Sequence, residues 1–260
     1  MRILITNDDG ITAPGLRAAE AIAAELAGDA GEVWIAAPAF EQSGVSHSVS
    51  YVRPMRIEEL EPRRFAVEGS PADCVLAGLY EIMKGGPPDL VFSGVNRGHN
   101  VAEDTVYSGT VGGAMEGALH GVPSVAVSQS YGPATGNGDP FSAARSLGPG
   151  LIRRLMEGAE WNRGPHGVFY NVNFPARAAG DVAGVRATVQ GHRPGATFGI
   201  MPQTAPNGRK FLWLTHGSGN AETAEGSDSR ECHEGHVTVT PLTADLTAHD
   251  LVAPLARLIA

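Results

Sequence analysis

RILITNDDGITAPGL, residues 2–16, contains in order a short apolar run, a polar loop and the beginning of a helical pattern. Residues 2–6 are rich in β-branched side chains and predict a buried strand, which ends at the polar residues 7–10. Pro14 and Gly15 precede apolar residues spaced along one helical face. The stretch therefore predicts a strand, a loop and a helix, which is the first unit of an α/β fold.

The same alternation continues through the first half of the chain. Strand patterns and helix patterns follow each other, with strands predicted at 32–36, 65–68, 90–92 and 122–128 and helices from 70, at 108–120 and at 140–157. Short apolar strands separated by helices predict a mostly parallel sheet covered on both faces. We expect residues 1–175 to form one α/β layered core.

The pattern changes after Pro175. Segments 182–189 and 211–215 read as strands, and Asn207-Gly208 is a good hairpin turn. Residues 217–235 are polar and glycine-rich, which predicts an exposed loop before a strand at 237–246 and a final helix from about Asp250. We expect residues 176–260 to form a hairpin, an extended arm and a terminal helix.

Composition narrows the class of protein. The chain has 260 residues, a formal net charge of −9 and a hydrophobic fraction of 42%. This acidic balance argues against non-specific binding of nucleic acid or an anionic membrane surface. Two cysteines are too few for a disulfide framework, and no apolar run approaches the roughly 20 residues of a transmembrane helix. Without a signal-peptide pattern, we expect a soluble, cytoplasmic protein.

Polar residues collect where the predicted strands end. Ligands of parallel α/β sheets bind at the loops that follow the carboxyl ends of the strands. Asp8 and Asp9 follow the first strand, and adjacent carboxylates repel each other unless a cation or hydrogen-bond donors compensate. The alternative is that one aspartate caps the turn while the other is solvated. The pair alone favours neither interpretation.

Ser43 and Asn96 follow two other predicted strands and shift this balance towards a metal site. With the two aspartates they form an all-oxygen set suited to Mg²⁺ or Mn²⁺. Four protein oxygens would leave about two positions for water and a substrate oxygen, an arrangement suited to hydrolysis. Ordinary loop hydrogen bonding remains the alternative for each residue taken singly.

Ser108, Gly109 and Thr110 open a predicted helix, and a helix N-terminus with hydroxyl groups can bind phosphate. Simple capping by Ser108 is the alternative. His47 and His99 lie in the neighbouring loops and are weaker candidates for a general acid or base. The segment 231–236, with glutamates, a cysteine and histidines, matches no standard zinc spacing, and we interpret it as surface or strand polarity.

Several motifs in order resemble the SurE family, the stationary-phase survival proteins, which are metal-dependent 5′/3′-nucleotidases. The resemblance rests on ITNDDGITAPGL at 5–16, APAFEQSG at 37–44, EGSPADCV at 68–75, SGVNRGHN at 93–100 and DTVYSGTVGGAMEG at 104–117. Weaker agreement follows in YNVNFP at 170–175, in the hairpin strand at 208–214 and in GHVTVTPL at 235–242. The motifs cover most of the chain, with least support at about 130–165 and 176–206.

The resemblance implies a Rossmann-like three-layer core with one divalent cation, Mg²⁺ or Mn²⁺, in each subunit. The matching ligands are Asp8, Asp9, Ser43 and Asn96, with Asp8, Asp9 and Asn96 also catalytic. Ser108, Gly109 and Thr110, together with Asn100, match the phosphate-facing positions. Family members remove phosphate from nucleoside monophosphates, and some also cleave short polyphosphate. Their C-terminal arm exchanges between subunits, which implies a homodimer or homotetramer.

This sequence departs from the family pattern at four places. Gln42 stands where an arginine is common, and His99 stands where a small residue or proline is usual. Val101-Ala102 replaces Leu-Gly, and Gly112-Gly113 replaces two alanines. These changes leave the metal set intact and leave the substrate preference open.

Two other functions remain open. In one, Asp8 is a covalent nucleophile, as in aspartyl-phosphate phosphatases. In the other, the chain is a non-catalytic module that binds or senses nucleotides. Neither accounts for four oxygen ligands as well as a metal-dependent phosphatase does.

Overall fold

The computed structural model describes residues 1–132, 135, 138–193, 198–216 and 223–260. Its main feature is a nine-stranded sheet in the order β3-β4-β2-β1-β5-β6-β7-β11-β8, and β9 and β10 form a separate two-stranded sheet. The strands are β1 (Arg2–Thr6), β2 (Glu32–Pro38), β3 (Ile57–Glu61), β4 (Arg64–Val67), β5 (Leu90–Arg97), β6 (Ser124–Gln129), β7 (Phe169–Phe174), β8 (Gly184–Ala187), β9 (Phe198–Thr204), β10 (Lys210–His216) and β11 (His236–Leu242).

The sheet is mostly parallel, as predicted. Every pairing from β4 to β7 is parallel, whereas β3 pairs antiparallel with β4 and β11 pairs antiparallel with β7. The edge strand β3 was not anticipated, because its residues 57–61 are all exposed and carry no buried apolar face. Its pairing with β4 fixes it at the edge of the sheet.

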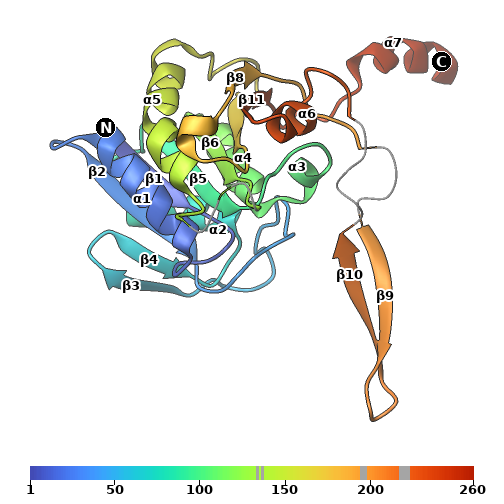
Figure 1. The fold of residues 1–260 in the computed structure, drawn as a ribbon, viewed down its shortest axis with the longest axis horizontal. Coiled ribbons are helices and arrows are strands. Elements are labelled where there is room, and N and C mark those ends of the chain that lie inside the picture. Colours follow the sequence, from blue (N-terminus) through green and yellow to red (C-terminus); the bar gives the residue numbers. More distant parts are fainter. Residues whose placement is uncertain (133–134, 136–137, 194–197, 217–222) are drawn as a thin grey trace.

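Helices cover both faces of the sheet (Figure 1). They are α1 (Pro14–Ala27), α2 (Pro71–Ala77), α3 (Asp104–Tyr107), α4 (Gly109–Leu119), α5 (Ser142–Gly158), α6 (Asp228–His233) and α7 (His249–Ile259), with short helical turns η1 (Gly78–Ile82) and η3 (Ala179–Asp181). Because side chains alternate along a strand, Ile3 and Ile5 pack with α1 and α5 in one core, whereas Leu4 packs with α2 in another. This is the expected three-layer α/β fold.

The sheet has its topological switch between β1 and β5. The chain runs from β1 to β2 on one side of it and later returns to β5 on the other side. Thr6 at the end of β1 lies opposite Ser93 in β5. In open α/β sheets the ligand crevice forms at this switch, beyond the carboxyl ends of the strands.

The sheet extends beyond Pro175. β11 pairs with β7, placing Thr238 opposite Asn173, and β8 pairs with β11. Two strands of the C-terminal part thus belong to the main sheet, and a functional division of the chain at residue 175 remains a prediction.

The prediction of an exposed loop at 217–235 is wrong for residues 228–233. Residues 228–233 form α6, with the Ser227 hydroxyl accepting from the Arg230 amide and with Asp228 and Cys232 buried. The polar composition concealed this helix because its buried face is short. The loop prediction for residues 217–222 lies outside the described residues.

The predicted hairpin is confirmed and projects from the body, as does α7 (Figure 1). Its strands expose large apolar side chains, among them Ile200, Leu212 and Trp213. No residue of α7 is buried, although Leu251 and Leu255 are apolar. Within the described residues no helix combines the length and apolar character needed to cross a membrane.

Candidate active site

The loop after β1 turns sharply at the switch point of the sheet. Gly10 has a φ of 99°, which L side chains rarely adopt, and its carbonyl accepts a hydrogen bond from the side-chain Nδ2 of Asn7 at 3.0 Å. The Ile11 amide donates to the Pro38 carbonyl of β2 at 2.8 Å. The turn is thereby tied to the neighbouring strand, and Asp8 and Asp9 sit within it.

Asp8 is a buried carboxylate held by the start of α4. Its Oδ1 accepts from the Thr110 hydroxyl at 2.6 Å, and its Oδ2 accepts from the Thr110 amide at 3.1 Å. A Cβ on Gly109 would lie 2.9 Å from the Asp8 Cβ, so the helix approaches closely only because that residue is glycine. Burial raises the pKa of Asp8 to about 6, against the opposing Thr110 hydroxyl bond and with a further rise from the Asp9 charge.

Asp9 adds negative charge beside Asp8, and Glu41 adds negative charge beside Asp9. Burial raises the pKa of Asp9, and the charge of Glu41 raises it further, whereas the Arg97 amide donates to Asp9 Oδ2 at 3.2 Å and lowers it. Ser43 is exposed, and its hydroxyl donates to Glu41 Oε1 at 2.9 Å. Glu41 is a member of this group that sequence reasoning did not select, although its place after a strand was the available signal.

Asn96 follows an irregularity in β5, the strand beside β1 at the switch of the sheet. The pairing with β6 shifts register between Gly94 and Asn96, and such a bulge redirects the side chains that follow it. The amide nitrogen of Asn96 donates to the Gly98 carbonyl at 2.9 Å. Its nitrogen is therefore engaged, and its oxygen is the atom suited to a cation.

The group of side chains fits a hard divalent cation. Two carboxylates whose pKa values are raised by burial lack full compensation of their charge, and a cation would supply it. Carboxylate, hydroxyl and amide oxygens are the ligands that Mg²⁺ and Mn²⁺ prefer. Asp8, Asp9, Ser43 and Asn96 offer oxygens of these kinds, and their assignment as the ligands of one ion stays a prediction.

The predicted phosphate-facing residues divide into two groups. Thr110 contacts Asp8, and Ser108 caps α4 by accepting from the Val111 amide at 3.1 Å. Asn100 is engaged elsewhere: its side-chain amide donates to Ser128 at 2.9 Å, and its backbone amide donates to Asn173 Oδ1 at 2.7 Å. The structure thus brings the start of α4 to Asp8 and links Asn100 to β6 and β7.

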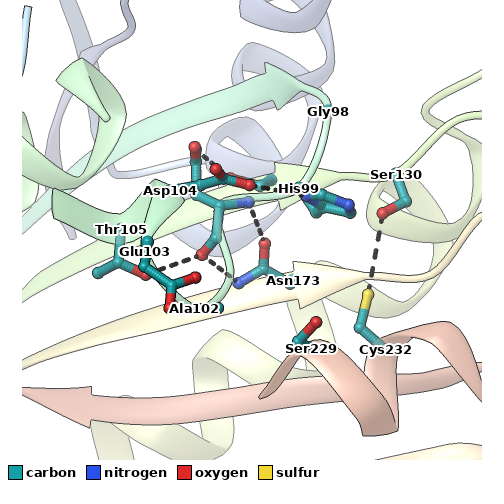
Figure 2. Close-up of polar contacts among 12 residues, drawn as sticks. Gly98, His99, Ala102, Glu103, Asp104, Thr105, Ser130, Asn173, Ser229 and Cys232 are labelled. Carbon is teal, nitrogen blue, oxygen red and sulfur yellow. Dashed lines mark hydrogen bonds and ion pairs between the residues drawn. The ribbon is translucent and has the colours of Figure 1, made fainter. Parts of the chain in front are cut away.

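The two candidate histidines pair with carboxylates outside the aspartate loop. His99 Nδ1 lies 3.6 Å from Asp104 Oδ2 (Figure 2). His47 Nε2 lies 2.5 Å from Glu116 Oε2, and His120 Nε2 lies 2.9 Å from the other oxygen of Glu116. Burial raises the pKa of Glu116, but the hydrogen bonds from the two histidines outweigh it, so this pKa lies below its usual value. His47 thereby fastens the loop after β2 to α4.

A second cluster lies near β11. One ligand atom each of Glu231, Glu234 and His236 falls within 4.8 Å of the others. Arg230 Nε lies 2.9 Å from Glu234, and Arg186 Nε lies 3.9 Å from Glu231. These ion pairs place positive charge beside two glutamates of the cluster, and the interpretation of the segment as surface or strand polarity stays a prediction.

The fold is a Rossmann-like α/β sheet that carries two acidic residues, Asp8 and Asp9, at the switch where this class of fold forms its ligand crevice. The family model "Survival protein SurE" matches residues 3–197. Proteins named "5'-nucleotidase SurE" from Cereibacter sphaeroides and Roseobacter denitrificans are 55% and 56% identical, over 100% and 98% of both chains respectively. The crystal structure of the SurE protein from Aquifex aeolicus is 32% identical and covers 100% of both chains with a TM-score of 0.81. The chain belongs to the SurE family.

Proposed function

We propose that this chain is a divalent-metal-dependent phosphomonoesterase that hydrolyses nucleoside 5′- and 3′-monophosphates, and also short polyphosphate. The observation that carries the proposal is the buried Asp8, held by Thr110 beside Asp9 at the switch of the sheet. The name that the two bacterial relatives carry, 5′-nucleotidase, supports the same chemistry.

The side chains of the site and the start of α4 have different roles in the proposed reaction. Asp8, Asp9, Ser43 and Asn96 would hold one Mg²⁺ or Mn²⁺, which when bound polarises a phosphoryl oxygen and lowers the pKa of water. Thr110 fixes the orientation of the Asp8 carboxylate through two hydrogen bonds. The positive end of α4 begins at Gly109 beside Asp8 and favours the phosphoryl oxygens there.

The contacts of Asp8 favour direct hydrolysis over a phospho-aspartate intermediate. Both of its oxygens already accept hydrogen bonds from Thr110, which stabilise the carboxylate and reduce its nucleophilicity. We expect ¹⁸O from labelled water to enter phosphate in one step, with inversion at phosphorus. Trapping of a phosphorylated Asp8 would contradict this assignment.

The direct test is phosphate release from 5′- and 3′-nucleoside monophosphates and tripolyphosphate. We expect phosphate release with Mn²⁺ or Mg²⁺ and none in excess EDTA. The ligand side chains carry oxygen atoms and no positive charge, so the cation is needed to neutralise the phosphate. Folded protein that releases no phosphate with any cation would instead be a nucleotide-binding module.

We also propose that the protein is a homodimer or homotetramer formed through its C-terminal arm. Support comes from α7, which has no buried residue, and from the apolar side chains of β9 and β10 that face solvent in a single chain. Exposed apolar patches of this kind mark interaction surfaces. A cytoplasmic location remains a prediction.

A further inference from the structure

A cavity opens beside the aspartate loop and is not used by the phosphate chemistry. Its volume is about 530 Å³, within the range of small-molecule pockets. The walls are the loop after β2 and the segment that joins β4 to α2, including Phe40, Gln42, Tyr51, Arg53 and Glu68.

The cavity and the candidate active site share a wall. Gln42 lines the cavity, and its backbone amide donates to the Asp8 carbonyl at 2.7 Å. β4 lies two strands from β1, a separation of about 10 Å across the sheet. A group attached to a phosphate beside Asp8 therefore has the cavity within reach on the β2 side.

The loop that forms the cavity is fastened at its base and open at its tip. The Ser50 hydroxyl and amide donate to the two oxygens of Asp73 at 2.7 and 2.8 Å, and the Ser70 hydroxyl donates to the Ser48 carbonyl. Tyr51, the next residue, is 93% exposed. The hydrogen bonds hold an aromatic side chain at the mouth although it has almost no packing of its own.

The side chains around the cavity combine aromatic faces with hydrogen-bonding edges. Phe40 and Tyr51 offer rings, the Arg53 guanidinium donates hydrogen bonds, and the Glu68 carboxylate accepts them. A nucleobase has the complementary chemistry, because its faces stack on aromatic rings and its edge carries both donors and acceptors.

We propose that this cavity binds the base of a nucleoside monophosphate whose phosphate lies beside Asp8, with Tyr51 as the principal stacking residue. The inference rests on the proposed function and assigns the specificity of the same site. Tyr51 is a binding residue and takes no part in the displacement at phosphorus.

The test compares substrates with and without a base. We expect Tyr51→Ala to raise KM for nucleoside monophosphates about ten-fold, the usual cost of one lost stacking contact. Tyr51→Phe keeps the ring and should restore KM. The inhibition constant of inorganic phosphate and the turnover of ribose 5-phosphate should stay as in the unaltered protein. Tyr80→Ala removes another exposed tyrosine, 69% exposed and outside the cavity, and should leave KM unchanged.

The outcomes separate this inference from the proposed function. Unchanged nucleotide KM in Tyr51→Ala, or an equal rise for nucleotides and ribose 5-phosphate, would overturn the base cavity while the phosphatase assignment stands. If the unaltered protein releases no phosphate from any ester, the proposed function fails. Calorimetry with adenosine and guanosine then tests whether the cavity binds a base. Binding that is lost in Tyr51→Ala and kept in Tyr51→Phe supports the base cavity, and the absence of binding to the unaltered protein overturns it.

Discussion

Replacing Asp8 by asparagine should make the cation-free protein more stable relative to the unaltered protein as the pH rises. Burial raises the pKa of Asp8 from 3.8 to about 6 in the folded state. The folded protein therefore binds more protons than the unfolded chain between these values. The associated stability is fully present below pH 3.8 and is lost as the pH rises through about 6.

The difference in pKa corresponds to about 3 kcal/mol of unfolding free energy at pH 8. Asparagine carries no charge but places an amide group against one of the two Thr110 donors, which costs about 1–2 kcal/mol at every pH. Asp8→Asn is then less stable than the unaltered protein at pH 4 and more stable at pH 8. For a chain of 260 residues, the difference in Tm between Asp8→Asn and the unaltered protein should therefore change by about 5 °C between pH 4 and pH 8.

The assay is urea and thermal unfolding of both proteins in EDTA from pH 4 to pH 8. Adding Mg²⁺ or Mn²⁺ at pH 8 should stabilise the unaltered protein and have a much smaller effect on Asp8→Asn, because the cation requires the ionised carboxylate. A stability difference that stays constant across this pH range would refute the assignment of an incompletely compensated buried charge to Asp8.

Three further changes test other parts of the argument. Gly109→Ala places a Cβ 2.9 Å from the Asp8 Cβ and should lower kcat/KM at least about ten-fold, whereas Gly158→Ala meets nothing within 4 Å and should keep full phosphate release; equal activities would contradict the close approach. Glu116→Gln should lower the free energy of unfolding in urea by about 1–3 kcal/mol at pH 7. The difference from the unaltered protein should disappear as the pH falls through the lowered pKa of the native Glu116 carboxyl. A difference that does not depend on pH would argue against the histidine contacts. Removing residues 249–260 should give a smaller assembly by light scattering, with far-UV dichroism per chain reduced only by the eleven helical residues of α7; an unchanged number of subunits would place the subunit contacts elsewhere.

The parallel core was predictable because its strands are short apolar runs between helices of clear periodicity. Residues 2–6 and 90–92 gave this signal, and both are central strands of the sheet. Edge elements lack it: β3 is exposed along its whole length, and α6 buries only a short face. Tertiary pairing determines such segments, and a single sequence does not display that pairing.

For the site, strand ends indicated which residues would gather but gave little information about their hydrogen bonds. Thr110 was predicted to face phosphate, and the structure adds that its hydroxyl holds Asp8. The pairing of His47 with Glu116 joins residues 69 positions apart, which no local pattern reveals. The four proposed metal ligands remain a prediction that the cation experiments address.

The position of β11 has a consequence for how the chain folds during synthesis. β8 precedes the hairpin in sequence, yet it pairs in the main sheet with β11, which follows about fifty residues later. Until residues 236–242 leave the ribosome, β7 has an open edge and β8 has no partner in the sheet. The exposed hairpin is made during this same interval. Completion of the sheet must therefore wait for nearly the whole chain, and the nascent protein depends on slow, long-range pairing at its last strand.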